Sequence, residues 1–244
     1  MTPAPDTAIL CGGQGTRLRA VLGDLPKPMA ALGGRPLLES LVRWAAAAGS
    51  TRVVLCAGVG ASHIREHFTH RDWGAEVVIS VEPEPLGTGG ALRLALPMLR
   101  SPAVLVLNGD SFLPAFHLAA LLGAPAHHAA GTLVVVPASG RDDAGRIRLD
   151  GAGRITAFEE KLPSSLAASA ATSAAFLNAG VYLFQRTLLE SIPAQGSVSL
   201  ERELLPAWIG AGLAALVHNG ELVDIGTPAR FETAQTGSPW PALN

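Results

Sequence analysis

The sequence predicts a three-layer α/β fold, in which helices cover both faces of a mainly parallel sheet. In the first half of the chain, short apolar runs alternate with segments of helical periodicity, and this alternation is typical of parallel sheets. The apolar runs are continuous, as expected for strands that are buried on both faces. The expected strands of this half are residues 7–11, 52–57, 76–81 and 103–107.

Helices are expected between these strands. Pro36 opens a segment whose apolar residues recur at helical spacing, and Gly49 is expected to end this helix. Residues 62–68 form a shorter expected helix. Residues 91–99 form a third, which is expected to begin after the glycine-rich run 87–90.

The second half is less regular. Its expected strands are residues 132–136, 146–149, 155–158, 179–184 and 222–225, and its expected helix is residues 200–209. The second and third of these strands are read as a hairpin around Asp150 and Gly151. Residues 163–173 are small, polar and rich in alanine, and they are the best candidate for a mobile loop.

Composition and charge exclude several classes of protein. The 244 residues have a formal net charge of −2, so the chain has no basic footprint for nucleic acid. No apolar run reaches the ~20 residues of a membrane-spanning helix, and the first residues do not resemble a signal peptide. We therefore expect a cytoplasmic protein that binds neither nucleic acid nor a membrane. Cys11 and Cys56 lie in apolar, strand-like contexts and are expected to be reduced, buried thiols.

A glycine-rich loop follows the first expected strand. Gly12, Gly13 and Gly15 allow the backbone to approach an anion closely, and consecutive amide groups in such a loop form an anion-binding concavity. Arg17 adds a guanidinium group that suits phosphate oxygens. The loop is neither a P-loop nor a dinucleotide fingerprint, because Leu18 stands where the fingerprint requires glycine and no lysine follows in register.

A lysine between two prolines comes next. Pro26 and Pro28 are expected to hold Lys27 on a stiff, extended segment, from which its ammonium group can be directed at a phosphate. Either feature alone would be an ordinary turn or a surface lysine. The glycine-rich loop and the lysine in this order after the first strand predict a phosphate-binding site.

Polar residues are also expected at the carboxyl ends of the strands. Ligands of parallel sheets bind at this edge, so the loops after Cys11, Val81 and Leu107 should converge on one crevice. Asp110 and Asp224 each come at the end of an expected strand. A turn or cap role is open for either aspartate alone. Two carboxylates beside bound phosphate oxygens suit Mg²⁺, which is the expected cofactor.

Together these motifs resemble the signature of the sugar-1-phosphate nucleotidyltransferases, from Ala8 to about Phe231. The segments that carry the resemblance are residues 12–18, 26–29, 84–91, 108–111, 158–161, 178–182 and 224–228. Within the family the likeness is greatest to the guanylyltransferases of D-glycero-α-D-manno-heptose 1-phosphate. The resemblance implies a Rossmann-like α/β/α fold and a Mg²⁺-dependent reaction that makes a nucleotide sugar and pyrophosphate. One departure is Cys11, where the family usually has alanine.

The resemblance also implies roles for individual residues. Arg17, Lys27 and Asp110 would be catalytic, and Asp110 and Asp224 would hold the metal. The nucleotide would contact Gly12, Gly13, Gly15, Thr16, Arg17, Gly87, Thr88 and Gly89, and the sugar phosphate would contact Lys27, Asn108, Glu160, Lys161, Asn178 and Gly180. The chain is read as one domain, residues 1–244, with a nucleotide half of about residues 1–130 and a sugar half of about residues 131–235. The nucleophile of the implied reaction is an oxygen of the sugar phosphate, which is already an anion. Catalysis should therefore consist of positioning and charge neutralisation.

Several alternatives stay open at this point. The substrates could be those of an N-acetylmuramate 1-phosphate uridylyltransferase or of a mannose or glucose 1-phosphate nucleotidyltransferase. A non-catalytic nucleotide-sugar sensor would share the fold. His63 and His67 match the His-x-x-Glu-His pattern of zinc hydrolases, although a solvated helix face is the commoner explanation. The expected partners are small-molecule substrates, and the expected assembly is a monomer or a homodimer.

Overall fold

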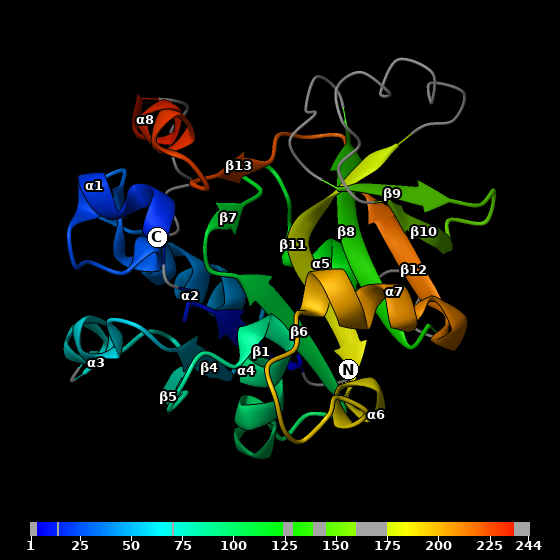
Figure 1. Ribbon diagram of the computed structural model, residues 1–244, viewed down its shortest axis with the longest axis horizontal. Helices are drawn as coiled ribbons and strands as arrows, with labels where there is room; N and C mark the ends of the chain where they lie inside the picture. Colours follow the sequence, from blue (N-terminus) through cyan, green and yellow to red (C-terminus); the bar gives the residue numbers. More distant parts are fainter. Residues whose placement is uncertain are drawn as a thin grey trace.

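A nine-stranded sheet forms the centre of the computed structural model, which describes residues 4–13, 15–69, 71–123, 129–138, 145–159 and 175–236 (Figure 1). The first part of the sheet is built from β1 (Asp6–Leu10), β4 (Arg52–Ala57), β5 (Glu76–Val81) and β6 (Ala103–Asn108). These strands are parallel and lie in the order β6-β1-β4-β5. The strands predicted for the first half are therefore confirmed, and their carboxyl ends share one edge.

The second half of the chain continues the same sheet. Its strands are β8 (Gly131–Pro137), β9 (Arg146–Leu149), β10 (Ile155–Glu159), β11 (Phe176–Gln185) and β12 (Leu213–Val217). β11 runs antiparallel to β6, β8 and β9, and it joins the two halves. β9 and β10 form the predicted hairpin, whereas β12, which runs parallel to β8, was not predicted. Leucine and alanine make up most of β12, and both residues favour helices.

Each face of the sheet has its own hydrophobic core. Successive residues of β4 alternate between the two cores, so that Val53 and Leu55 pack on one face while Val54 and Cys56 pack on the other. Helices α2 (Leu37–Ala47) and α3 (Ala61–Phe68) cover the first face, and α4 (Gly87–Ala95) covers the second. This arrangement explains the continuous apolar runs and confirms the three-layer fold.

Shorter elements complete the described part of the chain. They are the helices α1 (Arg19–Leu22), α5 (Leu118–Leu122), α6 (Arg186–Glu190), α7 (Leu205–Ala207) and α8 (Pro228–Thr236), and the strands β2 (Ala31–Leu32), β3 (Arg35–Pro36), β7 (Ser111–Phe112) and β13 (Val223–Asp224). The expected strand 222–225 is not part of the central sheet, because β13 pairs with β7 in a separate two-stranded sheet. Within the described residues, no helix has the length and apolarity that are needed to cross a bilayer.

Two expected helices differ in extent. α4 begins at Gly87, four residues earlier than expected, because Val198 O accepts the free N–H groups of Gly89 and Gly90 in its first turn. The expected helix 200–209 begins as a π-helical turn over Leu200–Leu204 before α7. Pro206 has no N–H to continue the α-helical ladder there. The predicted mobile loop, residues 163–173, lies outside the described residues.

Candidate active site

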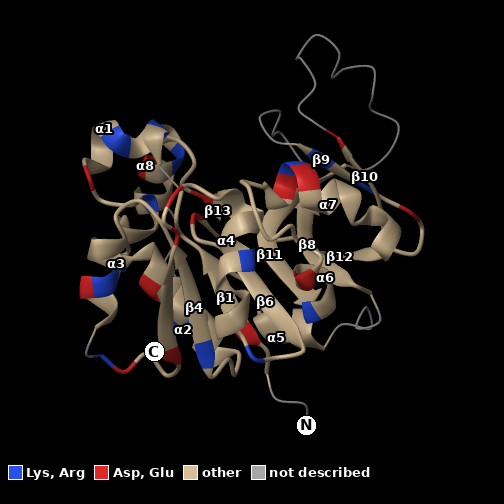
Figure 2. Ribbon diagram, turned by 60° about the horizontal axis from the view of Figure 1, so that its bottom comes forward, with Lys and Arg blue, Asp and Glu red and all other residues tan. Residues whose placement is uncertain are grey.

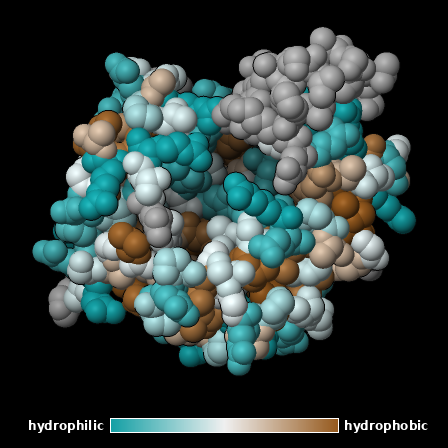
Figure 3. All heavy atoms as spheres, viewed as in Figure 1, coloured by the Kyte–Doolittle hydropathy of each residue, from teal (hydrophilic) through white to brown (hydrophobic). Residues whose placement is uncertain are grey.

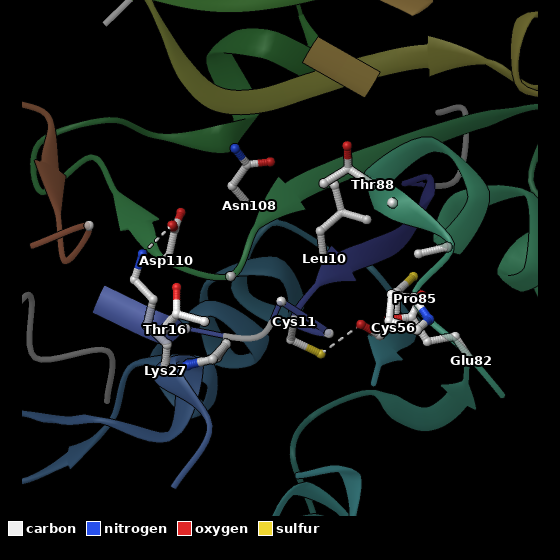
Figure 4. A pocket seen from close by; sticks show the side chains of 18 of the residues that line it. Leu10, Cys11, Thr16, Lys27, Cys56, Glu82, Pro85, Thr88, Asn108 and Asp110 are labelled. Atoms are coloured by element: carbon white, nitrogen blue, oxygen red, sulfur yellow. Dashed lines mark hydrogen bonds and ion pairs between the residues drawn. The ribbon is translucent and has the colours of Figure 1, made fainter. Parts of the chain in front are cut away.

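A cleft of about 540 Å³ opens at the carboxyl edge of the parallel strands. The loops after β1, β5 and β6 all line it, so the predicted convergence of these loops is confirmed. Ten of its lining residues were predicted from the sequence as site residues: Gly12, Gly13, Gly15, Thr16, Arg17, Lys27, Gly87, Thr88, Asn108 and Asp110. Figure 3 shows this face of the molecule hollowed near its centre. In the close view, Lys27 and Asp110 lie at one end of the cleft, and Glu82, Pro85 and Thr88 lie at the other (Figure 4).

The glycine-rich loop is shaped by the close approach of Lys27. Gly15 has a φ of 57°, which a residue with a side chain rarely adopts, and a Cβ at this position would lie 3.3 Å from Lys27 Cβ. A 3-10 turn, Thr16–Leu18, follows and places exposed Arg17 at the rim of the cleft. In Figure 2, Lys and Arg residues gather around this turn and α1.

Lys27 lies in a helical turn, and the expectation of an extended segment was wrong. Pro26 is extended, but Lys27 opens the 3-10 turn Lys27–Met29, in which Met29 N–H donates to Pro26 O at 2.8 Å. The fixed φ of Pro28 suits the second position of such a turn. Pro28 and Met29 are buried, and they anchor the lysine at the cleft wall.

Lys27 and Asp110 form an ion pair in the cleft. Lys27 Nζ donates to Asp110 Oδ2 at 2.6 Å, as the dashed line in Figure 4 marks. The Lys27 side chain is 15% exposed and the Asp110 side chain 41%, so the carboxylate stays open to the cleft. The two charges come from segments 83 positions apart in the chain. They form the charged end of the cleft.

Asp224 lies beside Asp110 on the neighbouring small sheet. It pairs with Ser111 in the register of β13 and β7, and Ile225 N–H donates to Asp110 O at 3.0 Å. Asp224 Oδ1 accepts hydrogen bonds from Gly226 N–H at 2.9 Å and from Arg230 at 3.1 Å. Of the two predicted metal ligands, Asp224 is therefore on β13, and Asp110 is in the turn that directly precedes its partner strand β7. Gly226 lines the cleft itself, whereas Asp224 does not.

The three nucleotide contacts predicted in α4 divide into two groups. Gly87 and Thr88 line the cleft. Gly89 is buried and does not line the cleft, and its N–H donates to Val198 O at 2.9 Å. A backbone contact from Gly89 N–H to a base would have to break this bond.

Three of the predicted sugar-phosphate residues, Asn108, Asn178 and Gly180, lie close together. Asn108 lines the cleft, and its Oδ1 is buried without a hydrogen-bond partner among the described residues. Asn178 Nδ2 donates to the Tyr182 hydroxyl at 2.8 Å, and Asn178 Oδ1 accepts from Gly180 N–H at 3.0 Å. Asn178 and Gly180 thus shape an irregular part of β11 behind Asn108 and do not line the cleft. The predicted Glu160 and Lys161 lie outside the described residues.

Two cleft carboxylates were not predicted as site residues. Glu82 follows β5 directly, and its Oε2 accepts a hydrogen bond from Leu86 N–H at 3.0 Å. Its place directly after a parallel strand was a signal for a site residue, because ligands bind beyond the carboxyl ends of such strands. Glu201 comes at the start of the expected helix 200–209. Ser199 does cap the turn by accepting from Arg202 N–H at 3.2 Å, while Glu201 lines the cleft.

The two cysteines are free, buried thiols at the floor of the cleft, as predicted. Cys11 Sγ donates to Cys56 O at 3.2 Å. Burial raises the pKa of Cys56 to about 12 and the pKa of Cys11 well above its usual value, and the charge of Glu82 adds to both shifts. Raised pKa values keep both thiols protonated, and therefore unreactive, at neutral pH.

We expect both thiols to resist alkylation in the folded protein. At pH 8, iodoacetamide should modify neither cysteine within the time that labels both in urea, where the thiol pKa returns to about 8.5. Intact-mass spectrometry of native and unfolded samples measures this. Because the folded pKa values are raised, the free energy of unfolding should fall as pH rises from the unfolded thiol pKa of about 8.5 toward the folded value of about 12 for Cys56. Rapid labelling of the native protein would contradict the burial of the cleft floor.

The alternative zinc site is not formed. His63 is exposed, whereas His67 packs against Trp73 and its Nε2 lies 2.9 Å from Glu39 Oε2 on α2. Within the described ranges, no group of three His, Cys, Asp or Glu side chains is placed to hold a metal. The His-x-x-Glu-His pattern is therefore part of a helix surface.

The comparison with protein families identifies the class to which this site belongs. The chain belongs to the nucleotidyl transferase family, whose model matches residues 7–238. Within that family it is a sugar-1-phosphate nucleotidyltransferase, as the motifs predicted.

Curated relatives and solved structures agree with this assignment. A D-glycero-alpha-D-manno-heptose 1-phosphate guanylyltransferase from Campylobacter jejuni is 30% identical over 91% of this chain and 95% of the relative. A mannose-1-phosphate guanylyltransferase from Mycobacterium tuberculosis is 33% identical over 93% of this chain and 62% of the relative. The crystal structure of HddC from Yersinia pseudotuberculosis superposes with a TM-score of 0.80 and 26% identity, covering 95% of this chain and 98% of HddC. HddC has also been solved in complex with GMP-PN.

Proposed function

We propose that this enzyme transfers GMP from GTP to D-glycero-α-D-manno-heptose 1-phosphate, which releases pyrophosphate and forms the GDP-sugar. The observation that carries the proposal is the difference between the two ends of the cleft, with Lys27 and Asp110 at one end and Glu82 and Thr88 at the other. The Campylobacter relative bears the name of this activity. We further propose that the first half of the chain binds the nucleotide and that the second half binds the sugar.

In this proposal the protein contributes charge and position. Arg17 and Lys27 would hold phosphate oxygens at the charged end of the cleft, where the glycine-rich loop leaves room for them. The sugar phosphate supplies an anionic nucleophile, so no side chain has to remove a proton. Holding this oxygen in line with the α-phosphorus and neutralising the leaving pyrophosphate would account for the catalysis.

The residues present fit a magnesium ion. Asp110 offers a carboxylate that is open to the cleft, and Asp224 offers a second one on β13, opposite the residue that follows Asp110. Carboxylate oxygens are the ligands that Mg²⁺ prefers, and when bound the ion would neutralise charge on the triphosphate. Asp110 and Asp224 are therefore the proposed metal ligands, with Asp110 nearer the substrates.

Removal of divalent metal should abolish the reaction. We expect no pyrophosphate release in excess EDTA and full recovery when Mg²⁺ is added back, because the triphosphate charge would otherwise be only partly neutralised. A coupled assay for pyrophosphate measures this. In a control, pyrophosphate is added directly to the coupling enzymes in EDTA, which verifies that they still work. Turnover that persists in EDTA would rule out the proposed cofactor.

The preference for guanine rests on Glu82. Its carboxylate lies at the end of the cleft away from Lys27, and no described cation pairs with it. A carboxylate can accept two hydrogen bonds from neighbouring donors, and guanine presents such donors at N1 and at its exocyclic amine. The Watson–Crick edge of adenine, cytosine or uracil carries an acceptor beside its donor. Glu82 would therefore favour guanine over the other bases.

Replacing Glu82 with glutamine should reduce the preference for GTP. A glutamine places one donor where guanine also has a donor, and discrimination of this kind is worth about 1–3 kcal/mol. We expect kcat/KM for GTP to fall at least about tenfold, while kcat/KM for UTP or TTP stays level or rises. Glu84→Gln is the matched control, because exposed Glu84 does not line the cleft. An unchanged ranking of the four nucleotides in Glu82→Gln would contradict the role of Glu82.

A substrate panel tests the proposed function as a whole. Purified enzyme is incubated with each of four nucleoside triphosphates against heptose, mannose, glucose and N-acetylmuramate 1-phosphates, and pyrophosphate release is measured. We expect GTP with the heptose 1-phosphate to give the highest kcat/KM. A higher value for mannose 1-phosphate would keep the guanylyl transfer but replace the proposed sugar, and no release with any pair would refute the proposal.

A further inference from the structure

The first turn of α4 is hydrogen-bonded to a segment of the sugar half. Leu86 O accepts from Val198 N–H at 2.9 Å, and Val198 O accepts from Gly89 N–H at 2.9 Å and from Gly90 N–H at 3.3 Å. Gly87 permits this approach, because a Cβ there would lie 2.5 Å from Val198 O. The backbone of the proposed nucleotide segment and the backbone around Val198 therefore form one connected unit.

Thr88 extends this connection with its side chain. Its hydroxyl oxygen accepts from Leu200 N–H at 2.7 Å, and the hydroxyl donates to Glu201 Oε2 at 2.7 Å. Both partners lie more than 110 positions away, since the separations are 112 and 113 residues. Although Thr88 was predicted to bind nucleotide, its hydroxyl donates its proton to the sugar half and also accepts a hydrogen bond from it.

These contacts determine the position of the Glu201 carboxylate. Oε2 is held by Thr88 and, at 3.2 Å, by the Ser199 hydroxyl. Oε1 accepts no hydrogen bond from the described residues, and Glu201 lines the cleft. One oxygen is thus fixed by the protein, and the other is available to a ligand that donates hydrogen bonds. The hydroxyl groups of a sugar are such donors, whereas a phosphate repels a carboxylate.

We propose that the Thr88 hydroxyl is a positioning group that couples the two substrates, by holding Glu201 toward the sugar from the turn that receives the nucleotide. When a nucleotide orders the first turn of α4, Thr88 orders Leu200 and Glu201 with it, and the sugar 1-phosphate then binds more tightly. The coupling is reciprocal, because the affinity change at one site must equal the change at the other. This inference rests on the proposed placement of the nucleotide and the sugar in the two halves.

Thr88→Val tests the hydroxyl with almost no change in shape. We expect the KM for the sugar 1-phosphate at saturating nucleotide to rise about tenfold, while the Kd of the nucleotide for the sugar-free enzyme changes less than about threefold, since the lost partners belong to the sugar half. Thr88→Ser keeps the hydroxyl and should restore the sugar KM to within about threefold of the wild-type value. Equal effects of valine and serine, or an equal rise in the nucleotide Kd of the sugar-free enzyme, would overturn the proposal.

A double-mutant cycle tests whether Thr88 acts through Glu201. If it does, Thr88→Val should have little further effect on the sugar KM in a Glu201→Ala background, because the group it positions is absent. Additive effects of the two substitutions would contradict this route. Melting temperatures of all variants identify any that unfold, and Thr88→Ser then carries the comparison with the wild type.

Hydrogen exchange gives a readout that is independent of the sugar. The Leu200 amide should exchange faster in Thr88→Val than in the wild type, and a non-hydrolysable GTP analogue should protect residues 198–204 only where the hydroxyl is present. Protection of this segment in both proteins would refute the coupling. Failure of every sugar 1-phosphate in the wild-type assay would instead refute the proposed function, so the two outcomes are distinguishable.

Discussion

Replacing Asp110 with alanine should lower the turnover number by about a hundredfold or more, as loss of a preorganised charge contact can. Asp110 follows β6 at the carboxyl edge of the sheet, and its carboxylate contacts Lys27 Nζ at 2.6 Å. It is at once the partner that positions Lys27 and the proposed magnesium ligand. Steady-state pyrophosphate release, measured beside a thermal melt, separates lost chemistry from lost folding.

Two further variants, one at Asp110 and one at an exposed control position, test this prediction more strictly. Asp110→Asn keeps the shape of the side chain but removes its charge, so it should lose nearly as much turnover as alanine. Asp24→Ala is the matched control, because Asp24 forms an exposed ion pair with Arg19 at 3.7 Å and its side chain is 91% exposed. Exposed pairs of this kind contribute little, and we expect turnover within about twofold of wild type. Near-normal turnover in both Asp110 variants would remove this residue from the site.

The parallel part of the fold was predictable because its sequence pattern follows directly from burial. Strands covered on both faces need mainly apolar residues, and β4 has them at five of its six buried positions, with Arg52 as the exception. The start of α4 was not predictable in this way. A run of glycines is typical of a loop, and only contacts with Val198, more than 100 residues away, make Gly87–Ala95 a helix. Local propensity was overridden by tertiary contacts there.

The same distinction holds for the site. The glycine-rich loop, Lys27 and Asp110 were predicted because each is part of a short motif that follows a strand. Glu82 and Glu201 were not, because a single carboxylate carries no local pattern. The place of Glu201 in the cleft depends on Thr88, 113 positions away. The position of Asp224 beside Asp110 likewise depends on the pairing of β13 with β7, two strands of two residues each.

Replacing Lys27 with methionine should also lower turnover by about a hundredfold or more, for a different reason. Methionine keeps most of the apolar stem and removes the ammonium group, so the phosphates would lose a positioned cation while the 3-10 turn Lys27–Met29 stays intact. Lys27→Arg keeps the charge but replaces a compact ammonium with a planar fork, and we expect it to recover only part of the turnover.

The Lys27 variant has a second consequence that activity alone would not reveal. In the free protein the ammonium of Lys27 forms an ion pair with Asp110, the carboxylate that is proposed to bind the metal. Its removal should therefore raise the affinity of the nucleotide-free enzyme for Mn²⁺ by a few-fold, which is the scale of a partly exposed ion pair. Electron paramagnetic resonance of free Mn²⁺ measures this affinity. The double variant Lys27→Met with Asp110→Ala should lose the gain, because the carboxylate that Lys27 masks is then absent. If Lys27→Met binds Mn²⁺ no better than the wild type, the lysine and the metal do not share Asp110.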